Sequence, residues 1–152
     1  ANNTNDYYYI DDIRLTGTPL SQTDDDGDGM EDTWEIQNFG AIDASNAGAT
    51  NNPDNDEVSN LQEYVLDRNP TNAAEPDARF EVRGNKADNG TSLTFPGSVK
   101  RNYTIQYKTN LSQGAWMNLP AQTNVRGTNS VMTLKDTDPG ELRYYRVRVT
   151  VP

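Results

Sequence analysis

The sequence of 152 residues contains no cysteine and no histidine. The absence of cysteine excludes disulfides, thiol nucleophiles and thiolate metal sites, and the absence of histidine removes the commonest general base and zinc ligand. Any bound metal must therefore be held by oxygen atoms, which favours Ca²⁺ or Mg²⁺. Apolar runs are also short, since none approaches the roughly 18 residues of a transmembrane helix. No membrane span is therefore predicted.

Basic residues are scarce in the first half of the chain. Residues up to Ala78 include 18 acids and two bases, whereas residues from Arg79 onward include five acids and 11 bases, so the two halves carry −16 and +6. Such an asymmetry indicates two modules with different roles. The first half is too acidic, and the second too weakly basic, for nucleic acid to be a predicted partner.

The first acidic segment has the spacing of an EF-hand-type calcium loop, D-x-[DN]-x-[DN]-G-x₅-E. Gly29 supplies the sharp turn, Met30 offers its backbone carbonyl, and the last carboxylate closes the shell with two oxygens. The carboxylates at loop positions 1, 3, 5, 9 and 12 are Asp24, Asp26, Asp28, Asp32 and Glu35. This spacing predicts a Ca²⁺ site.

A second segment repeats the same positions less completely. Its side-chain ligands are Asn52, Asp54, Asp56, Asn60 and Glu63, with Val58 at the carbonyl position. Glu57 replaces the turn glycine, which makes a left-handed backbone costlier by roughly 1 kcal/mol. Asn52 replaces an aspartate and lowers the ligand charge. We therefore expect a second, weaker Ca²⁺ site.

Each loop is expected to lead into a short helix. The first is predicted over Asp32–Phe39, where Gly40 is a C-cap signal, and the second over Asn60–Leu66. Trp34, Ile36 and Phe39 are predicted to form part of a small core around the loops.

The stretches TDDDGDGMEDTWEIQNFG and NNPDNDEVSNLQEYVLDRNPTN resemble thrombospondin type 3-like or dockerin-like calcium repeats of large secreted bacterial proteins. The resemblance covers about residues 23–72 and is complete for the first loop. It implies a Ca²⁺-stabilised spacer between extracellular modules. Docking to a cohesin does not follow from one irregular pair of loops.

After about residue 76 the hydrophobic pattern changes to a period of two, which is typical of half-buried strands. Strands are predicted over Arg79–Arg83, Ser92–Phe95, Asn102–Lys108, Trp116–Leu119, Ser130–Asp136 and Arg143–Val151. Short strands separated by turn signals indicate an antiparallel sandwich. The fold class is thus mainly β, with a six- to seven-stranded sandwich over residues 76–152 after a calcium-loop module over residues 19–75.

Three of these strand segments together resemble a fibronectin type III-like module of secreted bacterial proteins. They are Asn102–Tyr107, Trp116–Leu119 and Arg143–Val149. The last resembles the sixth strand of such a module, and a seventh strand would normally follow and pair beside it. A six-stranded sandwich would leave an open groove, which is an aggregation hazard.

The segment YYYIDDIRL within residues 1–18 offers a spare strand rich in β-formers. It could close its own sandwich, it could insert into the next copy as a donor strand and build a head-to-tail filament, or the chain could be part of a longer protein. The donor side chains would be Tyr7, Tyr9, Ile10, Ile13 and Leu15. The acceptor groove would be lined by Tyr145, Val147 and Val149.

The sequence indicates a non-catalytic structural protein, secreted or on the cell surface, whose partners are copies of itself. No nucleophile elbow or P-loop motif is present, and the calcium pattern accounts for nearly all paired carboxylates. The alternative is a polysaccharide-binding or spacer module of a secreted enzyme, using exposed rings. Its candidate rings are Tyr103, Tyr107, Trp116 and Tyr144, of which Tyr144 is expected to be the most exposed.

Overall fold

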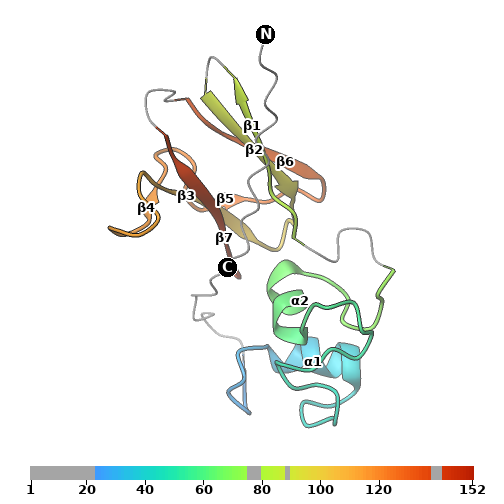
Figure 1. Ribbon diagram of the computed structural model, residues 1–152. Helices are drawn as coiled ribbons and strands as arrows, with labels where there is room; N and C mark the ends of the chain where they lie inside the picture. Colours follow the sequence, from blue (N-terminus) through green and yellow to red (C-terminus); the bar gives the residue numbers. More distant parts are fainter. Residues whose placement is uncertain (1–22, 75–79, 88–89, 138–141) are drawn as a thin grey trace. The chain divides into compact units, whose positions relative to one another are not determined.

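The computed structural model describes residues 23–74, 80–87, 90–137 and 142–152. Two compact units are present, one within Gly17–Arg79 and the other over Phe80–Thr150 (Figure 1). The boundary between them lies at residue 79, close to the position where the sequence pattern changes. The predicted strand within residues 1–18 lies outside the described residues.

The first unit contains two short helices with the predicted bounds, α1 (Asp32–Phe39) and α2 (Asn60–Leu66). Helix α1 has acidic residues in its first turn, where the helix dipole favours negative charge. It ends at Gly40, whose φ of 88° lets its N–H reach the carbonyl of Ile36 at 2.9 Å. Helix α2 begins after Ser59, whose backbone N–H donates to Gln62 Oε1 at 2.9 Å.

The core of this unit is small and includes part of both loops. Its buried apolar side chains are Met30, Ala47, Val58, Tyr64, Val65 and Leu66. The Trp34 ring packs in a T-shaped arrangement against the rings of Phe39 and Tyr64, at centroid distances of 5.7 and 5.3 Å. The predicted core position of Ile36 is wrong, since its side chain is 52% exposed. Residues two apart on a helix face different sides, so Trp34 and Ile36 cannot both point inward.

The second unit is built from two antiparallel sheets (Figure 1). The first sheet has the order β1-β2-β6, formed by Arg83–Ala87, Gly90–Pro96 and Val131–Asp136. In the second sheet, β3 (Asn102–Lys108) pairs with β7 (Tyr144–Thr150) along its length. On its other side β3 pairs with β4 (Met117–Asn118) and β5 (Val125–Arg126). The mainly β fold class with two short helices is confirmed.

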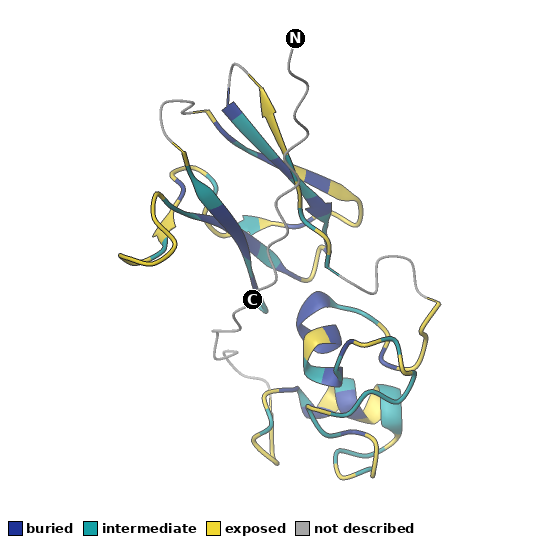
Figure 2. Cartoon of the chain, viewed as in Figure 1, coloured by how far each residue is buried: buried dark blue, intermediate teal, exposed yellow. Residues whose placement is uncertain are grey.

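The buried apolar residues of the long strands come at alternate positions and form the core between the sheets, and Figure 2 shows the buried stretches along these strands. The rings of Phe95 on β2 and Tyr103 on β3 lie 5.2 Å apart, so the two sheets contact each other. Leu93, Ile105 and Val147 are likewise almost fully buried. This arrangement is consistent with a β-sandwich.

One predicted strand needs correction, and one further strand is present that was not predicted. The first strand begins at Arg83 rather than Arg79, and the Phe80 ring packs 5.6 Å from the ring of Phe95. The apolar alternation at Phe80 and Val82 therefore reflects partial burial and not strand pairing. Strand β5 was missed because two residues are too few to show a period. Among the described strands, β7 pairs with β3 alone.

A buried ion pair joins the ends of β6 and β7. Asp136 is 2% exposed, and its Oδ2 accepts hydrogen bonds from Arg143 Nη1 at 2.7 Å and from the Tyr145 hydroxyl at 2.8 Å. Burial, with the bond to Asp136, raises the pKa of Tyr145 to about 12. These contacts link the first sheet to the second through a polar group inside the core.

Candidate metal centre in two acidic loops

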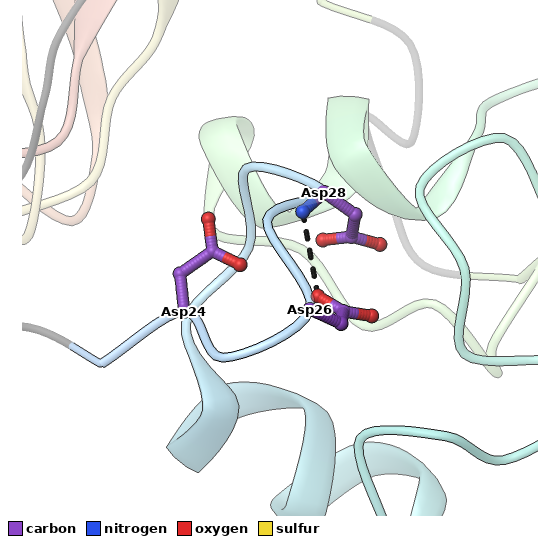
Figure 3. A group of neighbouring side chains, drawn as sticks. All are labelled: Asp24, Asp26 and Asp28. Carbon is purple, nitrogen blue, oxygen red and sulfur yellow. Dashed lines mark hydrogen bonds between the residues drawn. The ribbon is translucent and has the colours of Figure 1, made fainter.

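The loop before α1 gathers three aspartate side chains. One carboxylate oxygen from each of Asp24, Asp26 and Asp28 lies within 4.8 Å of the other two (Figure 3). Backbone groups of the loop orient these carboxylates: the N–H of Gly27 donates to Asp24 Oδ1 at 2.8 Å, and that of Met30 donates to Asp28 Oδ1 at 3.0 Å. Like charges at this separation repel, so the arrangement favours a bound cation.

Glu35, on α1, is the most deeply buried carboxylate of the first predicted ligand set. Its side chain is 0% exposed, and neither carboxylate oxygen has a hydrogen-bond partner among the described residues. Burial, followed by repulsion from Asp28 and the other loop aspartates, raises the pKa of Glu35 to about 7. A buried carboxylate without a hydrogen bond or a cation is costly. A donor set made only of oxygen atoms is of the kind that could hold a hard cation such as Ca²⁺.

Three of the five predicted carboxylate ligands of the first loop form the close group, and Asp32 and Glu35 are not part of it. Asp32 is 8% exposed, and its Oδ1 accepts the N–H of Asp25 at 2.9 Å. Met30 and Glu35 are buried at 1% and 0%. Burial also raises the pKa of Asp28, although the N–H groups of Met30 and Ala49 act in the opposite direction.

The second loop has a matching group. One oxygen from each of Asp54, Asp56 and Glu63 lies within 4.8 Å of the others. The N–H of Val58 donates to Asp56 Oδ1 at 2.8 Å, as happens at the equivalent position of the first loop. The other oxygens, Asp54 Oδ2 and Asp56 Oδ2, are buried without a hydrogen-bond partner in the described part of the chain.

The two amides of the second predicted set are positioned by hydrogen bonds. Asn52 Oδ1 accepts the N–H of Asn55 at 2.8 Å. Asn60 is 0% exposed, and its Nδ2 donates to the carbonyls of Asn46, Ala47 and Gly48. Its Oδ1 is buried without a hydrogen-bond partner among the described residues, which makes this oxygen a suitable cation ligand.

Both loops use a left-handed backbone at the same two positions. In the first loop Gly27 and Gly29 adopt φ of 75° and 95°, and in the second Asn55 and Glu57 adopt 62° and 76°. Glycine adopts this conformation freely, whereas a longer side chain in it costs about 1–2 kcal/mol. The second loop therefore copies the first at the cost of backbone strain at Glu57.

Relief of this strain is testable. Glu57→Gly is expected to stabilise the first unit by up to about 1 kcal/mol, because relief of 1–2 kcal/mol is partly offset by added freedom of the unfolded chain. Gly29→Ala at the matched position is expected to destabilise it. Urea unfolding at saturating Ca²⁺ measures both changes, and a loss of stability in Glu57→Gly would contradict the strain argument.

Sequence reasoning missed the segment between the two loops. The N–H of Ala49 donates to Asp28 Oδ2 at 2.8 Å, and Ala47 is 0% exposed. The sequence does not indicate this segment, because its hydrogen bonds to the loop and to α2 are made by backbone groups. Its small side chains also offer no metal ligand. Only the tertiary structure places the segment beside both sets of ligands.

The predicted acceptor residues of the second unit are buried in its core, Tyr145 at 8%, Val147 at 3% and Val149 at 1% exposure. Their role in a groove for a donated strand remains a prediction. The predicted donor residues lie outside the described residues.

The rings considered for a sugar platform mostly contact the protein itself. The Arg146 guanidinium lies 4.5 Å from the centroid of Trp116, and that of Arg143 lies 4.3 Å from the centroid of Tyr107. Tyr103 is 2% exposed and its hydroxyl accepts the N–H of Ser98 at 2.8 Å. These contacts favour packing roles for the three rings.

No protein-family model, curated protein or solved structure matches this chain. Among the described residues, neither helix is long or apolar enough to cross a bilayer.

Proposed function

We propose that this protein is a calcium-binding structural protein whose first unit holds two Ca²⁺ ions. The observation that carries the proposal is Glu35, a fully buried carboxylate whose oxygens have no hydrogen-bond partner among the described residues. The repeated loop geometry at Asp54, Asp56 and Glu63 supports a second site. The resemblance to thrombospondin type 3-like repeats and to fibronectin type III-like modules belongs to this proposal, as does an extracellular location.

Calorimetric titration of the full chain with Ca²⁺ tests the proposal. We expect two bound ions in the wild type, and one in each of two matched loop variants. These are Asp26→Ala/Glu35→Gln and Asp54→Ala/Glu63→Gln, which change positions 3 and 12 of each loop. Mg²⁺ serves as the comparison ion, since it demands a smaller and more rigid shell. Absence of Ca²⁺ binding to the wild type at millimolar concentration would overturn the proposal.

A second proposal concerns assembly and is favoured by the edge of β7. Among the described strands, β7 has a neighbour on one side only. An unpaired strand edge is a template for another strand. We propose that residues 7–15 of a neighbouring copy add to this edge and form a filament. The segment carries Asp11 and Asp12, and the partly exposed face of β7 carries Arg148, so the charges are complementary.

Deletion of residues 2–15 is expected to abolish polymerisation and leave monomers that retain both units. Analytical ultracentrifugation and negative-stain microscopy measure the change, and substitution of Asn3 and Asn5 by Ser is the matched control. Polymers that persist after the deletion would contradict strand donation. A monomeric wild type that loses stability on deletion would instead support closure of each sandwich by its own strand.

A further inference from the structure

The residue Ala49 contacts both halves of the candidate calcium module. Its N–H donates to Asp28 Oδ2 at 2.8 Å, and its carbonyl accepts the N–H of Leu61 at 3.1 Å. Asp28 belongs to the first carboxylate group, and Leu61 lies in the first turn of α2, two residues before Glu63. One peptide segment thus connects a ligand of the first loop with the helix that carries a ligand of the second.

The same segment is held from the other side by a predicted ligand. Asn60 Nδ2 donates to the carbonyls of the three residues that precede Ala49, at 2.8, 2.9 and 3.1 Å. The backbone N–H of Asn60 also donates to the carbonyl of Asn51 at 2.8 Å, which adds a further hydrogen bond between Asn60 and this segment. A shift of residues 46–51 would therefore disturb Asp28 and Asn60 together.

A ring contact provides a second connection between the two helices. Trp34 and Tyr64 meet edge to face, with centroids 5.3 Å apart and planes at 70°. Trp34 directly precedes Glu35, and Tyr64 directly follows Glu63. The two rings therefore join the helical turns that carry the carboxylate at position 12 of each loop. Such ring pairs prefer a defined geometry. Movement of one helical turn would therefore disturb the ring contact with the other turn.

We infer that the two loops bind Ca²⁺ cooperatively, coupled through the segment at residues 46–51 and through the Trp34–Tyr64 contact. The inference rests on the proposed calcium binding. The first ion orders Asp28 and Glu35, and these hold Ala49 and Trp34 in the positions that the second loop requires. Coupling of this kind is reciprocal, so each ion raises the affinity for the other by the same factor, typically about 5- to 150-fold.

The experiment compares three Ca²⁺ titrations of the full chain. The variants Asp26→Ala/Glu35→Gln and Asp54→Ala/Glu63→Gln give the association constant of each remaining site alone. The cooperativity factor is the product of the two wild-type association constants divided by the product of these single-site constants. A factor of about 5 or more supports the inference, and a factor near one overturns it. If the wild type binds no Ca²⁺, the proposed calcium-binding function itself is contradicted, and this result is distinguishable from non-cooperative binding at two sites.

Two pairs of variants test the route of coupling. Ala49→Pro removes the N–H that reaches Asp28, while Ala49→Gly keeps it as the matched control. Tyr64→Leu removes the ring that meets Trp34, while Tyr64→Phe keeps a ring. The Pro and Leu variants are expected to lower the cooperativity factor at least threefold and the controls to preserve it. If circular dichroism shows that Ala49→Pro does not fold, the Tyr64→Leu variant alone tests the route of coupling. A wild-type cooperativity factor in Tyr64→Leu would overturn the ring route.

Discussion

Removal of Ca²⁺ with EDTA is expected to unfold the first unit at a temperature about 20 °C or more below that of the calcium-loaded protein. At free Ca²⁺ about 100-fold above the dissociation constant, each site adds roughly 2.7 kcal/mol, or about 5 kcal/mol for two sites. For a unit of this size each kcal/mol shifts the melting temperature by about 4–8 °C. The physical reason is the buried carboxylate of Glu35, which four aspartates repel and whose charge a bound cation would offset.

Differential scanning calorimetry of the full chain measures this shift. The second unit carries neither carboxylate group, so its transition serves as an internal reference. Mg²⁺ added in place of Ca²⁺ is the ion control. Equal melting temperatures with and without EDTA would show that the loops do not need a metal to fold.

The variant Glu35→Gln tests the role of the buried carboxylate directly, because its effect on stability is expected to change sign when Ca²⁺ is added. Without Ca²⁺ the variant loses a buried, repelled charge and is expected to be at least as stable as the wild type. With Ca²⁺ it loses a ligand and is expected to be less stable. Asp43→Asn removes an exposed charge outside both loops and is the matched control. A variant that is destabilised equally in both conditions would indicate a packing role for Glu35.

The second large effect is expected in the β unit. Asp136→Ala removes the carboxylate that accepts from Arg143 and Tyr145, and leaves a guanidinium with only 10% of its side chain exposed. Removal of one partner of a buried pair typically costs 3–5 kcal/mol, about half the stability of a small domain. Urea unfolding followed by the fluorescence of Trp116 measures the loss, with Trp34 replaced by Phe in every protein compared.

Two controls separate the charge pair from general sensitivity. Glu81→Gln breaks the exposed pair with Arg83 and is expected to leave the unfolding midpoint unchanged. Asp136→Leu combined with Arg143→Met replaces the buried pair by apolar groups and is expected to recover much of the loss. A small effect of Asp136→Ala would mean that Arg143 turns to solvent at little cost.

The local parts of this structure were predictable because short segments determine them. The bounds of both helices follow from capping residues and acidic first turns, and the strand Asn102–Lys108 follows from its alternation. The ligand spacing was also readable, since alternate residues of one tight loop turn toward a common centre. The close groups at Asp24 and Asp54 contain residues predicted from spacing alone.

Contacts between distant segments depended on the tertiary structure. Nothing in the sequence shows that Ala49 bonds to Asp28, 21 residues away, or that Asp136 pairs with Arg143 inside the core. The burial of Glu35, on which the metal proposal depends, also requires the packed unit. The sequence alone determined which atoms could hold a cation, because ligand type and spacing are local. Only the fold decided how deeply those atoms lie and what connects the two loops, because burial and long-range hydrogen bonds arise from packing.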